Sequence, residues 1–208
     1  MAPTTGRSGA AVDINSVIAG MVDRGIWQYY GNLITAAGTL MLSQYTLFSY
    51  QLGTNDPITG VTKTLINTNM SNPKQFPPPR CLVLMSMGFY FRGMSLADID
   101  LILNNYYYEF FIDDKKFFEG ILEFQPSGLG VFGASAISGD AAWQNGFPAV
   151  QARRNFGRYS KYIAPLQQFT AKLTCGYSTP PTLTTTGDGG KGLNLYWILD
   201  GLTDRSVQ

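Results

Sequence analysis

Apolar and polar positions along this chain alternate in short runs, which predicts a structure made mostly of β-strands. The clearest period of two lies in Ile163–Cys175, where Phe169, Ala171 and Leu173 alternate with polar threonine and lysine. Other runs are apolar on both faces, as buried strands are. Strands are therefore also expected at Trp27–Ile34, Leu40–Leu52, Val61–Ile66, Cys81–Arg92, Tyr106–Ile112, Lys115–Phe124 and Leu193–Leu199.

The spacing of these runs predicts the fold class. About eight antiparallel strands separated by turn signals are typical of a two-sheet β-sandwich with Greek-key or jelly-roll connections. We therefore expect an all-β, single-domain β-sandwich of jelly-roll type over residues 26–208, with one or two short helices. The turn signals include Gly53–Pro57, Asp113-Asp114 and Asp200-Gly201, and loops are expected at Thr68–Pro79 and Ser178–Gly192.

Residues 1–25 are expected to form an N-terminal arm that carries a possible short helix. Met1–Ala11 is small, polar and contains glycine and proline, a composition that cannot bury much surface and is typical of a flexible arm. Between Asp13 and Asp23, apolar residues recur at helical spacing, and Gly25 would end such a helix. The apolar stripe could dock on its own domain or on a neighbouring subunit.

A helix is predicted immediately before the most aromatic part of the chain. Ser95 can cap its N-terminus, and the carboxylate of Asp98 three residues later resembles a capping box and favours the positive end of the helix. Asn104-Asn105 can end it. The apolar positions at helical spacing are Leu96, Ile99, Ile102 and Leu103.

The helix leads into a predicted β-hairpin whose two strands meet at Asp113-Asp114. With a two-residue turn, one face carries Tyr107, Glu109, Phe111, Lys116, Phe118 and Leu122. The other face carries Tyr106, Tyr108, Phe110, Ile112, Phe117 and Ile121. Both faces are apolar, whereas an edge hairpin of a monomer usually has one wet face. We expect one face to enter the core and the other to meet a neighbouring subunit, with Tyr106, Tyr108, Phe110, Phe111, Phe117 and Phe118 as candidate interface residues.

Two segments after the hairpin are expected to be irregular. Pro126–Gly139 is rich in glycine but contains no phosphate-binding motif, so it is predicted to be a plain loop. Asp140–Tyr162 holds one basic cluster interleaved with aromatic residues, made of Arg153, Arg154, Arg158 and Lys161. Such a cluster can bind single-stranded nucleic acid, or it can pair with carboxylates of a neighbouring subunit. The net charge of +1 favours the second alternative, and no specific nucleic-acid binding is expected.

The composition supports a chain whose surface is partly hidden by neighbours. Charged residues make up 14% of the chain, well below the usual quarter, and aromatic residues make up 13%. The chain contains 23 glycines and 11 prolines, which fits many turns. Its longest apolar runs fall far short of a membrane span, and no secretory signal is expected.

The candidate chemistry is sparse, so no catalytic, cofactor-binding or metal-binding residues are predicted. Histidine is absent, which removes the usual general base and the commonest metal ligand. Cys81 and Cys175 lie in apolar runs and are expected to be buried free thiols. Glu109 and Glu119 are expected on opposite faces of the hairpin, with Glu109 paired to Lys116 across it. An enzyme is the least supported class.

Two stretches of the chain resemble a known class of protein. They are FYFRGMSLADIDLILNNYYYEFFIDDKKFFEGILEFQPSG, and KYIAPLQQFTAKL followed downstream by LYWILDGLTDRSVQ. They resemble structural proteins of bacteriophage virions, in particular jelly-roll capsid proteins of icosahedral phages. The resemblance implies a capsid or capsid-associated subunit that assembles with itself and with other virion proteins, is made in the host cytoplasm and resides in the virion.

An alternative from the same fold class is a carbohydrate-binding β-sandwich. Tryptophan and tyrosine side chains commonly line sites for sugars, and this chain carries Trp27, Trp143 and Trp197 together with many tyrosines. Both hypotheses describe binding through surfaces. They differ in whether the partner is another protein subunit or a glycan.

Overall fold

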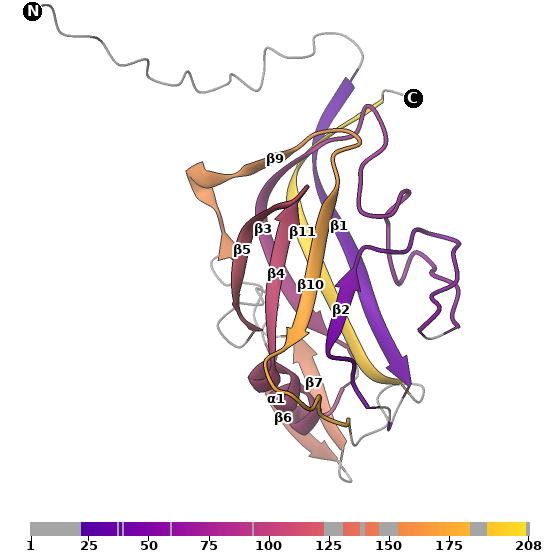
Figure 1. Ribbon diagram of the computed structural model, residues 1–208, viewed down its shortest axis with the longest axis vertical. Helices are drawn as coiled ribbons and strands as arrows, with labels where there is room; N and C mark the ends of the chain where they lie inside the picture. The colour runs from indigo at the N-terminus through magenta and orange to yellow at the C-terminus, as the bar shows by residue number, and fades with distance from the viewer. Residues whose placement is uncertain are drawn as a thin grey trace, which may run out of the picture.

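The computed structural model describes residues 22–36, 38, 40–58, 60–92, 94–122, 131–137, 140–145, 154–183 and 191–206. These residues form antiparallel β-sheets and one α-helix, with two larger sheets stacked face to face (Figure 1). The prediction of a mainly β, sandwich-like chain is confirmed. The predicted arm over Met1–Ala11 and most of the predicted helix after Asp13 lie outside the described residues.

One sheet has five strands. Its order is β1-β11-β3-β8, and β9 also pairs with β3. The strands are β1 (Val22–Ala36), β3 (Leu82–Phe91), β8 (Arg154–Asn155), β9 (Lys161–Ile163) and β11 (Lys191–Ser206). The first and last strands of the described chain are therefore hydrogen-bonded neighbours.

The second sheet has four strands in the order β2-β10-β4-β5. They are β2 (Gln44–Leu47), β4 (Tyr106–Ile112), β5 (Lys115–Ile121) and β10 (Phe169–Cys175). Helix α1 (Leu96–Asn105) connects β3 to β4, and a short 3-10 helix, η3 (Gly157–Tyr159), lies between β8 and β9. A separate hairpin pairs β6 (Val131–Ile137) with β7 (Asp140–Asn145).

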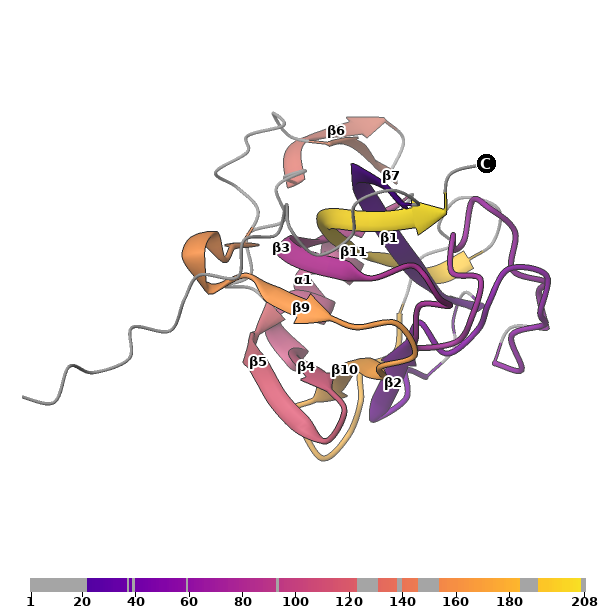
Figure 2. The same ribbon diagram turned by 90° about the horizontal axis from the view of Figure 1, so that it is seen from above.

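The core lies between the two larger sheets, which Figure 2 shows as two layers. Trp197 of β11 is fully buried, and its ring lies 5.9 Å from Tyr108 and 6.2 Å from Phe110, both on β4. Phe89 of β3 reaches Tyr108 at 5.7 Å. Because strands of both sheets contribute these rings, aromatic side chains fill the space where a barrel-like fold would otherwise hold a ligand.

Helix α1 and the hairpin turn follow the sequence prediction. The Ser95 hydroxyl accepts a hydrogen bond from the Asp98 backbone N–H at 3.1 Å, which satisfies one of the free amides at the start of the helix. The helix ends at Asn105 and the chain passes directly into β4. The strands β4 and β5 then meet at Asp113-Asp114, as expected.

Three predicted strands are wrong in length or kind. Leu40–Leu52 contains only the short β2, because Phe48 adopts a left-handed backbone conformation with φ of 59°. Ile163–Cys175 is divided between β9 and β10, which belong to different sheets, because Leu166 has φ of 63°. Val61–Ile66 forms no strand and makes one isolated bridge through Thr62.

Other segments are more regular than predicted. β11 continues through Asp200-Gly201 instead of turning there, and Met85 of the paired strand β3 is the extra residue of a β-bulge at this point. A Cβ at Gly201 would collide with the Val83 carbonyl. β1 begins at Val22, so Gly25 lies within a strand instead of ending a helix. Parts of the predicted loop Pro126–Gly139 and of the irregular segment Asp140–Tyr162 form β6, β7, β8 and β9.

Candidate functional site

The inner face of β4 belongs to the core of this chain. Tyr106, Tyr108 and Phe110 are exposed by only 2%, 1% and 0% of their surface. The Tyr106 hydroxyl donates a hydrogen bond to the Leu42 carbonyl at 2.7 Å, and burial raises the pKa of Tyr106 well above its usual range. These three residues cannot contact a neighbouring subunit, so their proposed role as interface residues is corrected.

A β-bulge changes which residues of the hairpin share a face. Phe110 pairs with Phe118, while Phe111 pairs with Lys116, so Phe117 is the extra residue on β5. Phe118 therefore lies on the core side, opposite to its predicted face. Its ring stacks on Phe156 with centroids 4.2 Å apart and 12° between the planes.

The outer face of the hairpin is more polar than expected. The bulge brings Glu109 and Glu119 directly opposite each other, so the prediction that they lie on opposite faces is wrong. The Lys116 ammonium bridges both carboxylates, at 2.6 Å from Glu109 and 2.8 Å from Glu119, which confirms the predicted pair with Glu109. The hydrogen bonds to Glu109 and Glu119 raise the pKa of Lys116. The Lys116 ammonium therefore offsets one of the two negative charges and holds the two carboxylates together.

Phe111 is the aromatic residue of this outer face. It is half-buried, and the ammonium groups of Lys172 and Lys116 lie 5.0 Å and 5.7 Å from its ring centroid. Of the six candidate interface residues, Phe111, Phe117 and Phe118 are half-buried and therefore partly accessible.

Phe117 lines an open cavity of about 610 Å³ between the hairpin turn and β9. Lys161 and Lys115 place their ammonium groups 5.1 Å and 5.4 Å from the Phe117 ring centroid. Asp113 accepts a hydrogen bond from the Gln167 side chain at 2.6 Å. The cavity thus carries both signs of charge beside an aromatic ring.

The structure gathers the predicted basic cluster only in part. Arg153 lies outside the described residues, and Arg154 forms a backbone pair with Met87 in β8. Arg158 is exposed on η3, next to Tyr159, which is 74% exposed. Lys161 contributes to the cavity described above, so the described cations are distributed along one margin of the sandwich.

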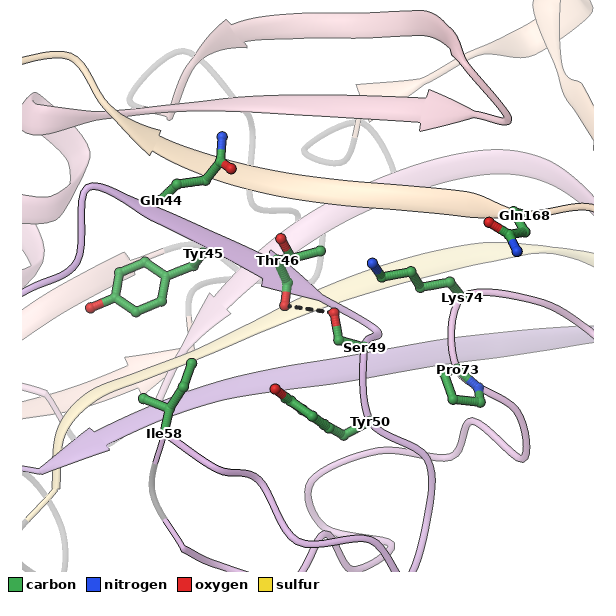
Figure 3. A pocket seen from close by; sticks show the side chains of 9 residues that line it. All are labelled: Gln44, Tyr45, Thr46, Ser49, Tyr50, Ile58, Pro73, Lys74 and Gln168. Atoms are coloured by element: carbon green, nitrogen blue, oxygen red, sulfur yellow. Dashed lines mark hydrogen bonds between the residues drawn. The ribbon is translucent and has the colours of Figure 1, made fainter.

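A second open cavity, of about 690 Å³, lies beside the edge strand β2 (Figure 3). The Ser49 hydroxyl donates to the Thr46 carbonyl at 3.2 Å and fixes the turn after the strand. Burial raises the pKa of Tyr50, and the nearby Asp56 carboxylate raises it further. The lining is mostly polar and consists of Gln44, Tyr45, Thr46, Ser49, Tyr50, Ile58, Pro73, Lys74 and Gln168.

A row of apolar side chains crosses the outer face of the five-stranded sheet. Its members are paired successively across four strands, as Ile26 with Leu202, Leu202 with Val83, and Val83 with Tyr162. Ile26 is 80% exposed and Tyr162 is 58% exposed, and Met85 beside the row is 42% exposed. We use the name apolar row for all five residues: Ile26, Leu202, Val83, Tyr162 and the adjacent Met85.

The connection between β2 and β3 presents further apolar side chains to solvent. Leu65 and Ile66 are 63% and 62% exposed, and Leu52, Ile58 and Val61 are exposed by nearly half. These residues follow one another along a segment that covers the margin where β1 and β2 meet. Surface patches of this kind commonly mark contact sites.

A buried ion pair holds that connection in place. Lys63 and Asp56 are exposed by 4% and 1%, and the Lys63 ammonium lies 2.9 Å from the Asp56 carboxylate. The same ammonium donates to the backbone and side-chain oxygens of Asn32 on β1 at 3.1 Å and 3.2 Å. Asp56 also accepts from the Ile58 N–H at 2.9 Å. Neither Lys63 nor Asp56 lies in a recognisable motif, so the sequence alone does not predict this ion pair.

The three tryptophans of the carbohydrate alternative lie in different surroundings. Trp197 is fully buried, and Trp27 is 44% exposed on β1. Trp143 lies on the β6–β7 hairpin, where only the backbone pairing is described. They do not form one described aromatic platform.

The remaining candidate chemistry is limited. Both cysteines are free, as predicted, although Cys175 is half-buried. Burial raises the pKa of the Cys81 thiol, which lies 3.4 Å from the Asp204 carboxylate. Within the described ranges, no cluster of three potential metal-ligating residues occurs. In the same part of the chain, no helix is long and apolar enough to cross a membrane.

Neither protein-family models, nor curated proteins, nor solved structures give a match to this chain.

Proposed function

We propose that this chain is a self-assembling virion structural protein, a capsid or capsid-associated subunit that acts through contacts between subunits. The observation that carries the proposal is the apolar row. Ile26 and Tyr162 expose large apolar side chains on the outside of a domain whose interior is already filled with aromatic rings. Exposed apolar surface on a well-packed domain is characteristic of a protein that buries it against partners.

The strand order supports assigning the sandwich to the jelly-roll type. If the β6–β7 hairpin is left aside and β8 and β9 are counted as one position, the two sheets read 1-8-3-6 and 2-7-4-5 in chain order. Jelly-roll domains alternate between their two sheets in this manner, and they occur in viral capsids and in lectins. The fold alone does not distinguish between those functions, so the assignment rests on the properties of the surface.

The proposal is tested by the size of the purified full-length chain. We expect light scattering and negative-stain electron microscopy to show particles or oligomers of fixed stoichiometry, alone or after addition of the other proteins of its virion. A chain that remains a 22.8-kDa monomer at high concentration under both conditions would contradict the proposal.

A carbohydrate-binding module is the second candidate, and the cavity beside β2 is the observation that favours it. Tyr50 offers an aromatic ring there, while Gln44, Ser49 and Lys74 offer hydrogen-bonding groups, a combination that suits sugar hydroxyls. Binding on a glycan array that is lost in Tyr50→Ala and kept in Tyr177→Ala, a change at an exposed tyrosine outside the cavity, would support it. Absence of binding to any glycan would contradict it.

A further inference from the structure

Strand β1 forms one edge of the five-stranded sheet, and half of that edge is covered by the chain itself. The Asn69 side chain accepts from the Tyr30 N–H at 2.9 Å and donates to the Gln28 carbonyl at 2.6 Å, as a neighbouring strand would. The Asn32 N–H donates to the Asn67 carbonyl at 2.9 Å. Native proteins protect sheet edges in this way, because open edges pair with other chains.

On the other half of the edge, Val22–Ile26, the Ile26 side chain is 80% exposed. β1 and β11 pair without a register shift from Val22 to Ile34. Because backbone groups alternate in direction along a strand, the N–H and C=O of Ile26 and Arg24 point away from β11, as those of Tyr30 and Asn32 do. Within the described residues, no group donates to or accepts from the outward N–H and C=O of Ile26. The same residue carries the most exposed large apolar side chain described.

A second copy of this chain fits this half of the edge because the segment is complementary to itself. If two copies pair antiparallel about Gly25, Arg24 of each faces Ile26 of the other in hydrogen-bonded positions, which gives four backbone hydrogen bonds. The pairing stops before Gln28, so Asn69 stays in place in both copies. Ile26 then lies against the partner, and the apolar row of each copy continues toward the interface.

Gly25 would lie at the centre of this contact. A Cβ added there meets no atom within 4 Å, so the position tolerates a side chain in the single chain. Residues that face each other in a non-hydrogen-bonded antiparallel pair have Cα atoms about 4.5 Å apart. That spacing lies within the range a disulfide can bridge.

We infer that two copies of this chain join through the edge Val22–Ile26 of β1, forming a continuous sheet across a two-fold axis. This inference deepens the proposed function by naming one contact of the assembly. The pairing uses main-chain hydrogen bonds for affinity and the Ile26 side chain for burial.

The test is disulfide trapping in the full-length chain under mild oxidation, analysed on non-reducing gels. We expect Gly25→Cys to give at least about tenfold more covalent dimer than Ile66→Cys, because a fixed contact raises the effective concentration of the two thiols. Ile66 is 62% exposed but lies on the β2–β3 connection, so it reports random collisions. Gln28→Cys, on the part of the edge that Asn69 covers, should also trap little dimer. The wild-type chain controls for Cys81 and Cys175.

Light scattering of the wild-type chain in the same buffer separates the two proposals. Particles without a Gly25→Cys dimer would overturn edge pairing and leave the proposed function intact. A Gly25→Cys dimer in a chain that never exceeds dimer size would support edge pairing and contradict assembly into a shell. A wild-type chain that stays monomeric both alone and with the other proteins of its virion, with no trapped dimer, would overturn both proposals. Equal trapping at Gly25 and Ile66 would overturn edge pairing.

Discussion

The two margins of the sandwich, where an edge of one sheet approaches an edge of the other, are closed by different chemistry. At the β1 and β2 margin, the β2–β3 connection is fixed by the buried Lys63–Asp56 pair and its hydrogen bonds to Asn32. At the β5 and β9 margin, Phe118 stacks on Phe156, and an open cavity remains beside them.

The two margins differ in how strictly their geometry is fixed. A buried ammonium with three oxygen partners has one good geometry, because any displacement leaves a charge without a partner in a region of low dielectric. Stacked rings tolerate sliding and tilting at small cost. The first margin therefore holds the exposed Leu65 and Ile66 in defined positions, while the second can adapt to what enters its cavity.

The largest expected effect comes from breaking the buried ion pair. Lys63→Met should lower the free energy of unfolding by about 3–5 kcal/mol, because Asp56 would keep a buried negative charge with no cation beside it. Urea denaturation followed by tryptophan fluorescence measures the change. The double variant Lys63→Met, Asp56→Leu should recover much of the loss, since it removes both charges. If the single variant costs no more than the double variant, the first margin is not held by this pair.

At the aromatic margin, Phe118→Ala should cost about 2–3 kcal/mol, below the range for a fully buried phenylalanine because Phe118 is only half-buried. Phe118→Leu keeps most of the apolar volume and should cost clearly less, which is the tolerance that separates this margin from the other. The same denaturation experiment applies. A Leu variant as unstable as the Ala variant would show that this margin is as geometrically strict as the ion pair.

A smaller effect is expected where Asn69 covers the edge of β1. Asn69→Ala removes two hydrogen bonds to Tyr30 and Gln28 at the surface, so it should cost about 1 kcal/mol. It should also lengthen the edge available for pairing, and the variant should form larger species in light scattering than wild type at equal concentration. Thr62→Ala, a surface change on the same connection that leaves β1 covered, is the control. Unchanged stability and size in Asn69→Ala would contradict the covering role.

Much of the aromatic margin could be predicted from the sequence, and little of the polar one. The cap at Ser95, the turn at Asp113-Asp114 and the strands on either side follow from local signals that need no tertiary contact. Lys63 and Asp56 are separated by a loop and meet a third partner, Asn32, on a distant strand. No local pattern encodes such a contact.

The misplaced strand ends have a common physical cause. Phe48 and Leu166 both adopt positive φ inside apolar runs, so the chain turns sharply where periodicity predicts continuity. Leu and Phe rarely accept this conformation, which makes it invisible to residue preferences. The same limit applied to the hairpin, since strand parity separates Glu109 from Glu119 and a bulge at Phe117 brings them together.

The smallest expected effect tests that bulge. Because Lys116 is solvent-exposed, Lys116→Gln should shift the urea midpoint only slightly near neutral pH. Glu109 and Glu119 would then face each other without a cation, so the variant should gain stability relative to wild type as acid protonates them and lose it as they ionise. In wild type the pKa of Lys116 is raised, so its contribution is complete below the unfolded pKa and is lost as pH rises through the folded pKa. Urea midpoints of both proteins from acidic to alkaline pH check this pattern, and parallel curves would contradict the pairing of the two carboxylates.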